Sequence, residues 1–413
     1  MAGRFANRHA LVAGATGTGK TTTLASMAEG FAAMGVPSLV LDVKGDLSGL
    51  LRANAGELWS PMGDTGRAAR LDLWRMGPDL IARALDLSDA QSGALDVAFA
   101  VAEAESLPLA TLADLRALLS HVVANARDYS ATYGLVTPSS VAAVQRSALR
   151  LEREAREAFG APCLNVALCA RLDDHGRGLI TVLQCDRLTR TPGLYGALCA
   201  FLLSDLYGRF PEVGDLDRPR LALFLDESHL IFSGAPPPLV AKLESIVRLI
   251  RSKGVALVFV TQSPADLPTG IAGQLQNRIQ HGLRAVTAAD ARAVRAAADS
   301  LPRAPGFNAA RAIESLGVGV ALVSTVGADG VPLPVDVVRI ARPAARLGPL
   351  DPGEAEAFYV ASPVVAAVVP VVAAAPSPVQ WQPGPPRKRR PMLATLIWGV
   401  PIVVAFWTVC ARL

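Results

Sequence analysis

Cysteine and histidine are both scarce in this chain of 413 residues, with five of each. No two cysteines have C-x-x-C spacing, and no histidine stands at zinc-finger distance from a cysteine, which argues against the common zinc modules. We therefore expect the cysteines to be small core residues in a reducing compartment, and not a disulfide framework. They are Cys163, Cys169, Cys185, Cys199 and Cys410.

Charged and aromatic residues are also few, at 18% and 5% of the chain, and the formal net charge is only +4. A charge of this size does not by itself indicate a nucleic-acid-binding surface, and the sequence has no basic-aromatic stripe. The N-terminus has no signal-peptide pattern. In contrast, 51% of the residues are hydrophobic, which is enough for a sizeable core.

The most informative segment is residues 14–21, which fit the phosphate-binding pattern G-x-x-x-x-G-K-[ST]. Its glycines allow tight turns that direct backbone N–H groups at phosphates, and the next helix directs its positive end there. Lys20 is expected to reach the β- and γ-phosphates, and the Thr21 hydroxyl to hold Mg²⁺. A chance match in a chain rich in Gly, Ala and Thr is the alternative. The predicted nucleotide-binding residues are Gly14, Ala15, Thr16, Gly17, Thr18, Gly19, Lys20, Thr21 and Thr22.

A second motif argues against a chance match. Residues 221–227 form an apolar run followed by two acids, Asp226 and Glu227. An acid at the end of such a strand is the expected Mg²⁺ partner in P-loop enzymes, and a second acid suits the general base that activates water. Alone, the pair also fits a helix N-cap and a surface acid. With the upstream loop, it predicts nucleotide hydrolysis by Glu227 with Mg²⁺ on Asp226.

The remaining pattern predicts an α/β fold with a mainly parallel sheet and an all-helical insertion. The insertion either covers the sheet or grips a substrate. Residues 51–75 are expected to be irregular, residues 274–286 to form a helix and then a strand, and residues 319–340 to form a hairpin. Buried strands are expected at 9–13, 37–42, 178–183, 221–226 and 255–260. The predicted parts are 1–77 and 161–350 for the two halves of the ATPase core, 78–160 for the insertion, 351–390 for a linker and 391–413 for a hydrophobic tail.

A polar loop follows the second predicted strand and includes Asp42, Lys44 and Asp46. Ligands of open α/β folds bind at the carboxyl edge of the sheet, where this loop should lie. These residues are therefore candidates for supporting the nucleotide site. The alternative is a polar turn between a strand and a helix.

Taken in order, these motifs resemble the HerA-like helicase and bipolar DNA translocase ATPases, in the HerA–FtsK branch of the P-loop NTPases. The likeness covers roughly residues 7–350 and is closest to a bacterial subfamily with a minimal N-terminus. The segments that carry it are 7–21, 42–49, 224–230, 250–255, 259–264 and 273–278.

The resemblance implies a RecA-like motor that hydrolyses ATP with Mg²⁺, assembles as a homohexameric ring and acts on DNA. It places a polar sensor at Gln262 and a trans-acting arginine at Arg251, with Arg248 and Arg278 as weaker candidates. For Arg251, the alternative is a cation favoured by the dipole at a helix C-terminus. Two other functions stay open: a membrane-associated ATPase that moves or remodels protein, and a nucleotide-gated scaffold.

The C-terminal part differs in composition from the rest. Residues 351–390 are rich in Pro, Ala and Val, as expected for an extended linker, and end in the basic cluster Arg387-Lys388-Arg389-Arg390. Residues 392–411 then carry no charge and are long enough to span a bilayer. We therefore predict a motor tethered to the cytoplasmic membrane by one transmembrane helix at 391–413. A buried C-terminal helix is the alternative.

Overall fold

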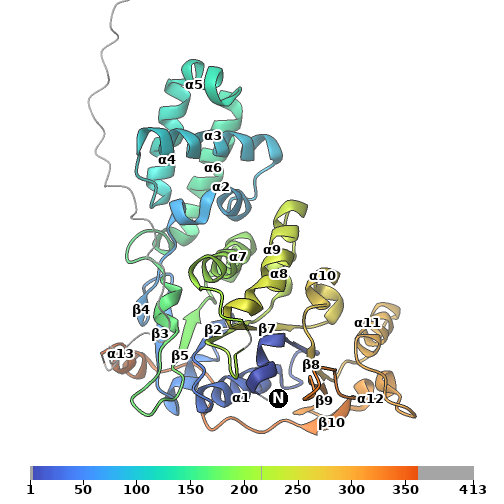
Figure 1. Ribbon diagram of the computed structural model, residues 1–413. Helices are drawn as coiled ribbons and strands as arrows, with labels where there is room; N and C mark the ends of the chain where they lie inside the picture. Colours follow the sequence, from blue (N-terminus) through green and yellow to red (C-terminus); the bar gives the residue numbers. More distant parts are fainter. Residues whose placement is uncertain (1–2, 215, 361–413) are drawn as a thin grey trace, which may run out of the picture. The chain divides into compact units, whose positions relative to one another are not determined.

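The computed structural model describes residues 3–214 and 216–360 (Figure 1). In these residues a ten-stranded sheet has the order β10-β9-β8-β1-β7-β6-β2-β5-β3-β4. Neighbours from β8 to β4 pair in parallel, whereas β9 pairs antiparallel with β8 and β10, so the predicted α/β class and mainly parallel sheet are confirmed. The strands are β1 Ala10–Ala13, β2 Ser38–Asp42, β3 Gly56–Ser60, β4 Arg67–Ala68, β5 Ile180–Gln184, β6 Leu221–Leu225, β7 Val255–Thr261, β8 Asn277–His281, β9 Val320–Ser324 and β10 Asp336–Arg339.

Helices cover both faces of the sheet, as its parallel strands require. Successive side chains of a strand point to opposite faces, and β1 shows this directly: Leu11 and Ala13 belong to one hydrophobic core, Ala10 and Val12 to the other. Helix α1 packs in the second core, and α7 and α9 pack in the first (Figure 1). These helices and the shorter ones of the same part are α1 Lys20–Ala33, α7 Pro192–Arg209, α8 His229–Phe232, α9 Pro237–Leu249, α10 Thr269–Ala272, α11 Ala288–Asp299 and α12 Ala309–Ser315.

A run of helices separated by short loops follows, as the periodicity of residues 78–160 predicts, although it begins earlier, at Leu73, and its last α-helix ends at Ala155. Helices α3 to α6 pack on one another, and α2 joins them to α7 on the sheet. The local signals are clear in α6, where Thr137 accepts a hydrogen bond from the Ser140 N–H and Pro138 takes the first helical position. The helices are α2 Leu73–Ala84, α3 Asp89–Glu105, α4 Leu112–Ala124, α5 Ala126–Tyr133 and α6 Pro138–Ala155.

Two local predictions are wrong. Residues 51–75 are not irregular, because β3 and β4 extend the sheet there. The glycines and the proline of this segment favour turns, yet Gly56 begins β3, and the buried carboxylate of Glu57 forms an ion pair with Arg171 at 2.5 Å. Similarly, residues 277–281 form strand β8 and not the end of a helix. Its polar residue Asn277 is satisfied by donating hydrogen bonds to the carbonyls of Phe5 and His9.

The C-terminal part of the described chain begins with the predicted hairpin, formed by β9 and β10. Residues 340–350 then cross α1: the backbone N–H groups of Ala344 and Ala345 donate to Glu29. At the start of the predicted linker, Pro352–Val360 form helix α13. The predicted span at 391–413 and the basic cluster at 387–390 lie outside the described residues. Among the described residues, no helix combines the length and apolarity needed to cross a membrane.

Candidate active site

The P-loop follows β1 at the carboxyl edge of the sheet and leads into α1. Lys20 is the first residue of this helix, and its Nζ donates hydrogen bonds to the carbonyls of Gly14 at 2.6 Å and Ala15 at 3.0 Å. The loop thus folds around the ammonium group. Burial lowers the pKa of Lys20, and the positive charge of Lys44 lowers it further. A buried cation bonded only to neutral carbonyls is suited to receive a phosphate.

Three neighbouring strands fix the P-loop backbone. The N–H of Gly14 donates to the carbonyl of Gln262 after β7, and the N–H of Ala15 donates to Gly282 after β8. Thr18 accepts a hydrogen bond from the N–H of Gly319, just before β9. The loop conformation therefore depends on residues far away in sequence.

His281 is a neighbour of the P-loop that the sequence did not reveal. Its Nε2 lies 2.8 Å from the hydroxyl of Thr23 on α1, and its side chain is buried. Burial lowers the pKa of His281 to about 4, with a further contribution from Lys20, so the ring is neutral at physiological pH. No local signal marks this residue, because its role arises from the pairing of β8 with β1.

Replacing Gly14 with alanine should weaken nucleotide binding. A Cβ at this position would lie 2.5 Å from the Cβ of His281, so the loop or β8 must shift. We expect the affinity for ADP to fall roughly tenfold or more, because the phosphate-binding N–H groups lose their alignment. Gly30→Ala on α1 is the control, since it meets no atom within 4 Å and should bind ADP normally. Normal ADP binding by Gly14→Ala, measured by calorimetry, would contradict this account.

The two predicted acids lie at the same edge, directly after β6. Burial raises the pKa of Asp226 to about 6, against the opposing effect of Lys44. Asp226 accepts the Glu227 N–H with its carboxylate and the Tyr195 hydroxyl with its carbonyl. Glu227 has a φ of 44°, an uncommon conformation for a residue with a side chain, and it is only 9% exposed. The backbone thus holds the Glu227 carboxylate in a fixed, nearly dry position.

The loop after β2 joins this acid pair. The buried carboxylate of Asp42 accepts backbone N–H groups from each of the next residues 45–48, and burial raises its pKa to about 6. Asp42 therefore shapes the loop, as the polar-turn interpretation proposed. Lys44, in contrast, reaches the site, with its Nζ 2.9 Å from Oε1 of Glu227. Asp46 donates its N–H to Asp42 and accepts the Gly348 N–H, so it helps to fix the loop.

The oxygen groups at this edge fit magnesium and a nucleotide. Thr21, which is half-buried, offers a hydroxyl and Asp226 a carboxylate, and Mg²⁺ prefers oxygen ligands supplemented by substrate phosphates. Oε2 of Glu227 is buried, lies 3.4 Å from Nδ1 of His229 and forms no hydrogen bond within the described residues. These observations make Thr21 and Asp226 suitable magnesium ligands.

The sensor and arginine candidates occupy different edges. Gln262 follows β7 at the P-loop edge and is exposed. Arg251 lies in the short helix Ile250–Lys253 before β7, at the opposite edge, about 20 Å away by the rise of seven strand residues. Arg248 is exposed on α9, and Arg278 on β8 donates to the carbonyl of Ala272. The elements that carry these three arginines do not bring them to the P-loop of their own chain.

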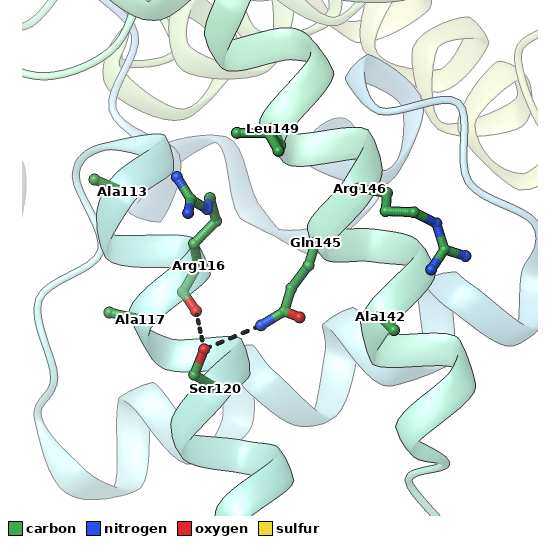
Figure 2. A pocket seen from close by; sticks show the side chains of 8 residues that line it. All are labelled: Ala113, Arg116, Ala117, Ser120, Ala142, Gln145, Arg146 and Leu149. Carbon is green, nitrogen blue, oxygen red and sulfur yellow. Dashed lines mark hydrogen bonds between the residues drawn. The ribbon is translucent and has the colours of Figure 1, made fainter.

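A pocket of about 670 Å³ lies between α4 and α6 (Figure 2). Across it, Gln145 donates a hydrogen bond of 3.0 Å to the hydroxyl of Ser120. It contains no residue of the predicted nucleotide site, so the hydrolysis site and this pocket are separate. Its lining residues are Ala113, Arg116, Ala117, Ser120, Ala142, Gln145, Arg146 and Leu149.

Comparisons with known proteins agree with this geometry. A family described as "Helicase HerA-like C-terminal" matches residues 1–58 and 50–370. A comparison with curated protein sequences gives no match. Among solved structures, the unbound conjugative coupling protein TrwBdeltaN70 is similar, with a TM-score of 0.56, 16% identity and coverage of 85% of this chain and 88% of that chain.

Two further solved structures have the same fold. TrwB in complex with ADP and Mg²⁺ has a TM-score of 0.57 and 15% identity, covering 84% of this chain and 88% of that chain. VirB4 of Thermoanaerobacter pseudethanolicus has a TM-score of 0.55 and 14% identity, covering 80% and 90%. The family match extends over most of the chain. The chain therefore belongs to the helicase HerA-like C-terminal family, in the HerA–FtsK branch of P-loop ATPases.

Proposed function

We propose that this protein is an ATP-driven motor whose hydrolysis site is formed by the P-loop, the acid pair and the loop after β2. The observation that carries the proposal is the convergence of Lys20, Asp226 and Glu227 at one sheet edge, with Lys44 bridging to Glu227. Glu227 accepts a proton from water as the water oxygen bonds to the γ-phosphorus. The bond between that phosphorus and the bridging oxygen then breaks, and ADP and phosphate leave.

The individual residues divide this work. Lys20 and the N–H groups of the P-loop hold the β- and γ-phosphates. Thr21 and Asp226 are the residues that would hold Mg²⁺, which neutralises charge on the phosphates when bound. Gln262 would orient the γ-phosphate or the water, and the bond from the Gly14 N–H to its backbone carbonyl keeps this residue next to the P-loop.

We further propose that the motor is a homohexameric ring that acts on DNA. The description of the family as helicase-like and the similarity of this fold to a conjugative coupling protein support a DNA substrate. The position of Arg251 supports a ring, because an arginine at the opposite edge of the sheet serves an active site only in a neighbouring subunit. The membrane tether at 391–413 stays a prediction from the sequence.

DNA should stimulate the ATPase, and the stimulation should fall steeply with salt. A motor that follows a phosphate backbone binds through lysine and arginine contacts, so releasing counterions makes its affinity salt-dependent. Between 50 and 200 mM salt, six or more phosphate contacts imply a loss of about 10³-fold in affinity. The measurement is ATPase activity with and without double- and single-stranded DNA at both concentrations.

Two other results would redirect the proposal. A high basal rate that no DNA stimulates would favour the ATPase that moves or remodels protein. A slow rate under every condition would favour the nucleotide-gated scaffold. DNA binding that does not depend on salt would contradict a motor that follows the phosphate backbone of DNA.

A further inference from the structure

An ion pair joins Lys44 to Glu227, the proposed general base. Nζ of Lys44 lies 2.9 Å from Oε1 of Glu227, and Nδ1 of His229 lies 3.4 Å from Oε2. The Glu227 side chain is 11% exposed, whereas that of Lys44 is 38% exposed. Glu227 is therefore the fixed partner and Lys44 the mobile one, with a flexible four-carbon stem.

Hydrogen bonds hold the backbone of the loop that carries Lys44, whereas the Lys44 side chain can change its conformation. Asp42 binds the backbone of residues 45–48, and Gly45 adopts a left-handed φ of 77° that closes the turn. Residues 46 and 49 are also hydrogen-bonded to Gly348. The loop thus presents the Lys44 ammonium to the site without needing to move itself.

Two ammonium groups face this site from opposite sides of the acid pair. Lys20 comes from the P-loop after β1, and Lys44 from the loop after β2. They are close enough for the charge of Lys44 to lower the pKa of Lys20. Burial opposes the charged form of Lys44, but the negative charges of Asp226 and Glu227 outweigh it and raise the pKa of Lys44. Lys44 thus keeps its positive charge beside the acid pair.

ATP brings the negative charge of a γ-phosphate close to these lysines, whereas ADP has no γ-phosphate. A phosphate carries more charge than one carboxylate and offers three acceptor oxygens, so it competes strongly for a mobile ammonium group. Lys20 already has to contact the phosphates from the P-loop side. Lys44 contacts the acid pair through Oε1 of Glu227. If the Lys44 ammonium group moved to the γ-phosphate, Oε1 of Glu227 would become accessible to water.

We propose that Lys44 is a second phosphate-contacting residue, which pairs with Glu227 and transfers to the γ-phosphate when ATP binds, so that ATP itself frees Oε1 of the base. This inference rests on the proposed function, because it takes the γ-phosphate as the ligand and Glu227 as the base. It assigns to one lysine both the recognition of ATP against ADP and the timing of hydrolysis.

The first test compares the affinities for ADP and for β,γ-imido-ATP, each with Mg²⁺, in the full-length protein. Lys44→Ala should weaken binding of the imido analogue about tenfold to a hundredfold and leave ADP binding nearly unchanged, as loss of one charged hydrogen bond implies. Lys44→Arg keeps the charge and should restore most of the preference for the triphosphate. Lys242→Ala, an exposed lysine on α9, is the matched control and should behave as wild type.

The second test is a double-mutant cycle with Glu227→Gln. Removing the carboxylate releases Lys44, so imido-ATP should bind several-fold more tightly than to the wild type. That gain should shrink in the Lys44→Ala background, and ADP should show no such coupling. A purely structural lysine would not produce coupling that depends on the γ-phosphate.

Three results would overturn the inference. An unchanged ratio of imido-ATP to ADP affinity in Lys44→Ala would mean that Lys44 does not contact the γ-phosphate. Faster ATP hydrolysis by Lys44→Ala with an unchanged affinity ratio would mean that Lys44 only inhibits Glu227 and does not bind the γ-phosphate. Equal loss of both nucleotides would indicate a structural role. Failure of the proposed function is seen separately, as near-normal turnover by Glu227→Gln.

Discussion

Glu227→Gln should stop ATP turnover while nucleotides remain bound. The amide cannot accept the proton of the attacking water, and general-base catalysis contributes about 10²- to 10⁴-fold. Glutamine has the same length as glutamate, so the left-handed backbone at φ 44° experiences no new side-chain bulk. The buried Asp226 and the P-loop remain in place, and the loss should therefore fall on the rate of phosphate release and not on ADP affinity.

The measurement is steady-state phosphate release together with ADP titration of the same preparation. Glu103→Gln, which removes an exposed carboxylate from α3, is the matched control and should hydrolyse ATP at the wild-type rate. If Glu227→Gln turned over ATP at a near-normal rate, another group would be the base. Loss of ADP binding would instead show that the carboxylate supports the architecture of the site.

The P-loop and the acid strand were predictable because their signals are local. A glycine-rich pattern, a lysine and an apolar run ending in acids are each contained in fewer than ten residues. Strand β3 was not predictable from such a pattern. The glycines of this segment predict turns, and the partner that neutralises Glu57 in the core, Arg171, lies more than a hundred positions later.

The same distinction separates the predicted from the unpredicted parts of the site. Lys44 was only one of three polar candidates in its loop. Its side chain meets Glu227 because β2 and β6 are neighbours in the sheet, whereas Asp42 binds the backbone of its own loop. His281 reaches Thr23 because β8 pairs with β1, an arrangement that no sequence window contains. Residues whose contacts lie on another strand can thus be recognised only when the order of the strands in the sheet is known.

The topology of the sheet also shows at which edge Arg251 lies relative to the P-loop. The helix Ile250–Lys253 enters β7 from the amino edge, whereas the P-loop leaves β1 at the carboxyl edge. Buried His9, at the amino end of β1, experiences the charge of Arg251: burial lowers its pKa to about 4, and Arg251 contributes to this. An arginine so placed is remote from the P-loop edge of its own chain, which is why we propose a role for it in an adjacent subunit.

Arg251→Ala should therefore cut ATP turnover by about 10³-fold or more with little change in ATP affinity, as loss of a trans-acting arginine does. The guanidinium would stabilise charge that develops on the γ-phosphate in the transition state, so ground-state binding should not depend on it. Arg292→Ala, which removes an exposed arginine from α11, is the control and should retain turnover. Wild-type turnover by Arg251→Ala would exclude the assignment.

Mixing two inactive variants tests whether Arg251 acts across the subunit interface. Lys20→Ala lacks a functional P-loop but keeps Arg251, whereas Arg251→Ala keeps an intact P-loop site. In a ring assembled from both, some intact sites of Arg251→Ala subunits face the arginine of a Lys20→Ala neighbour. Activity should then reappear and reach its maximum near equal mixing, because each subunit supplies what the other lacks. An arginine acting within its own chain would give no recovery at any ratio, since neither variant has a complete site.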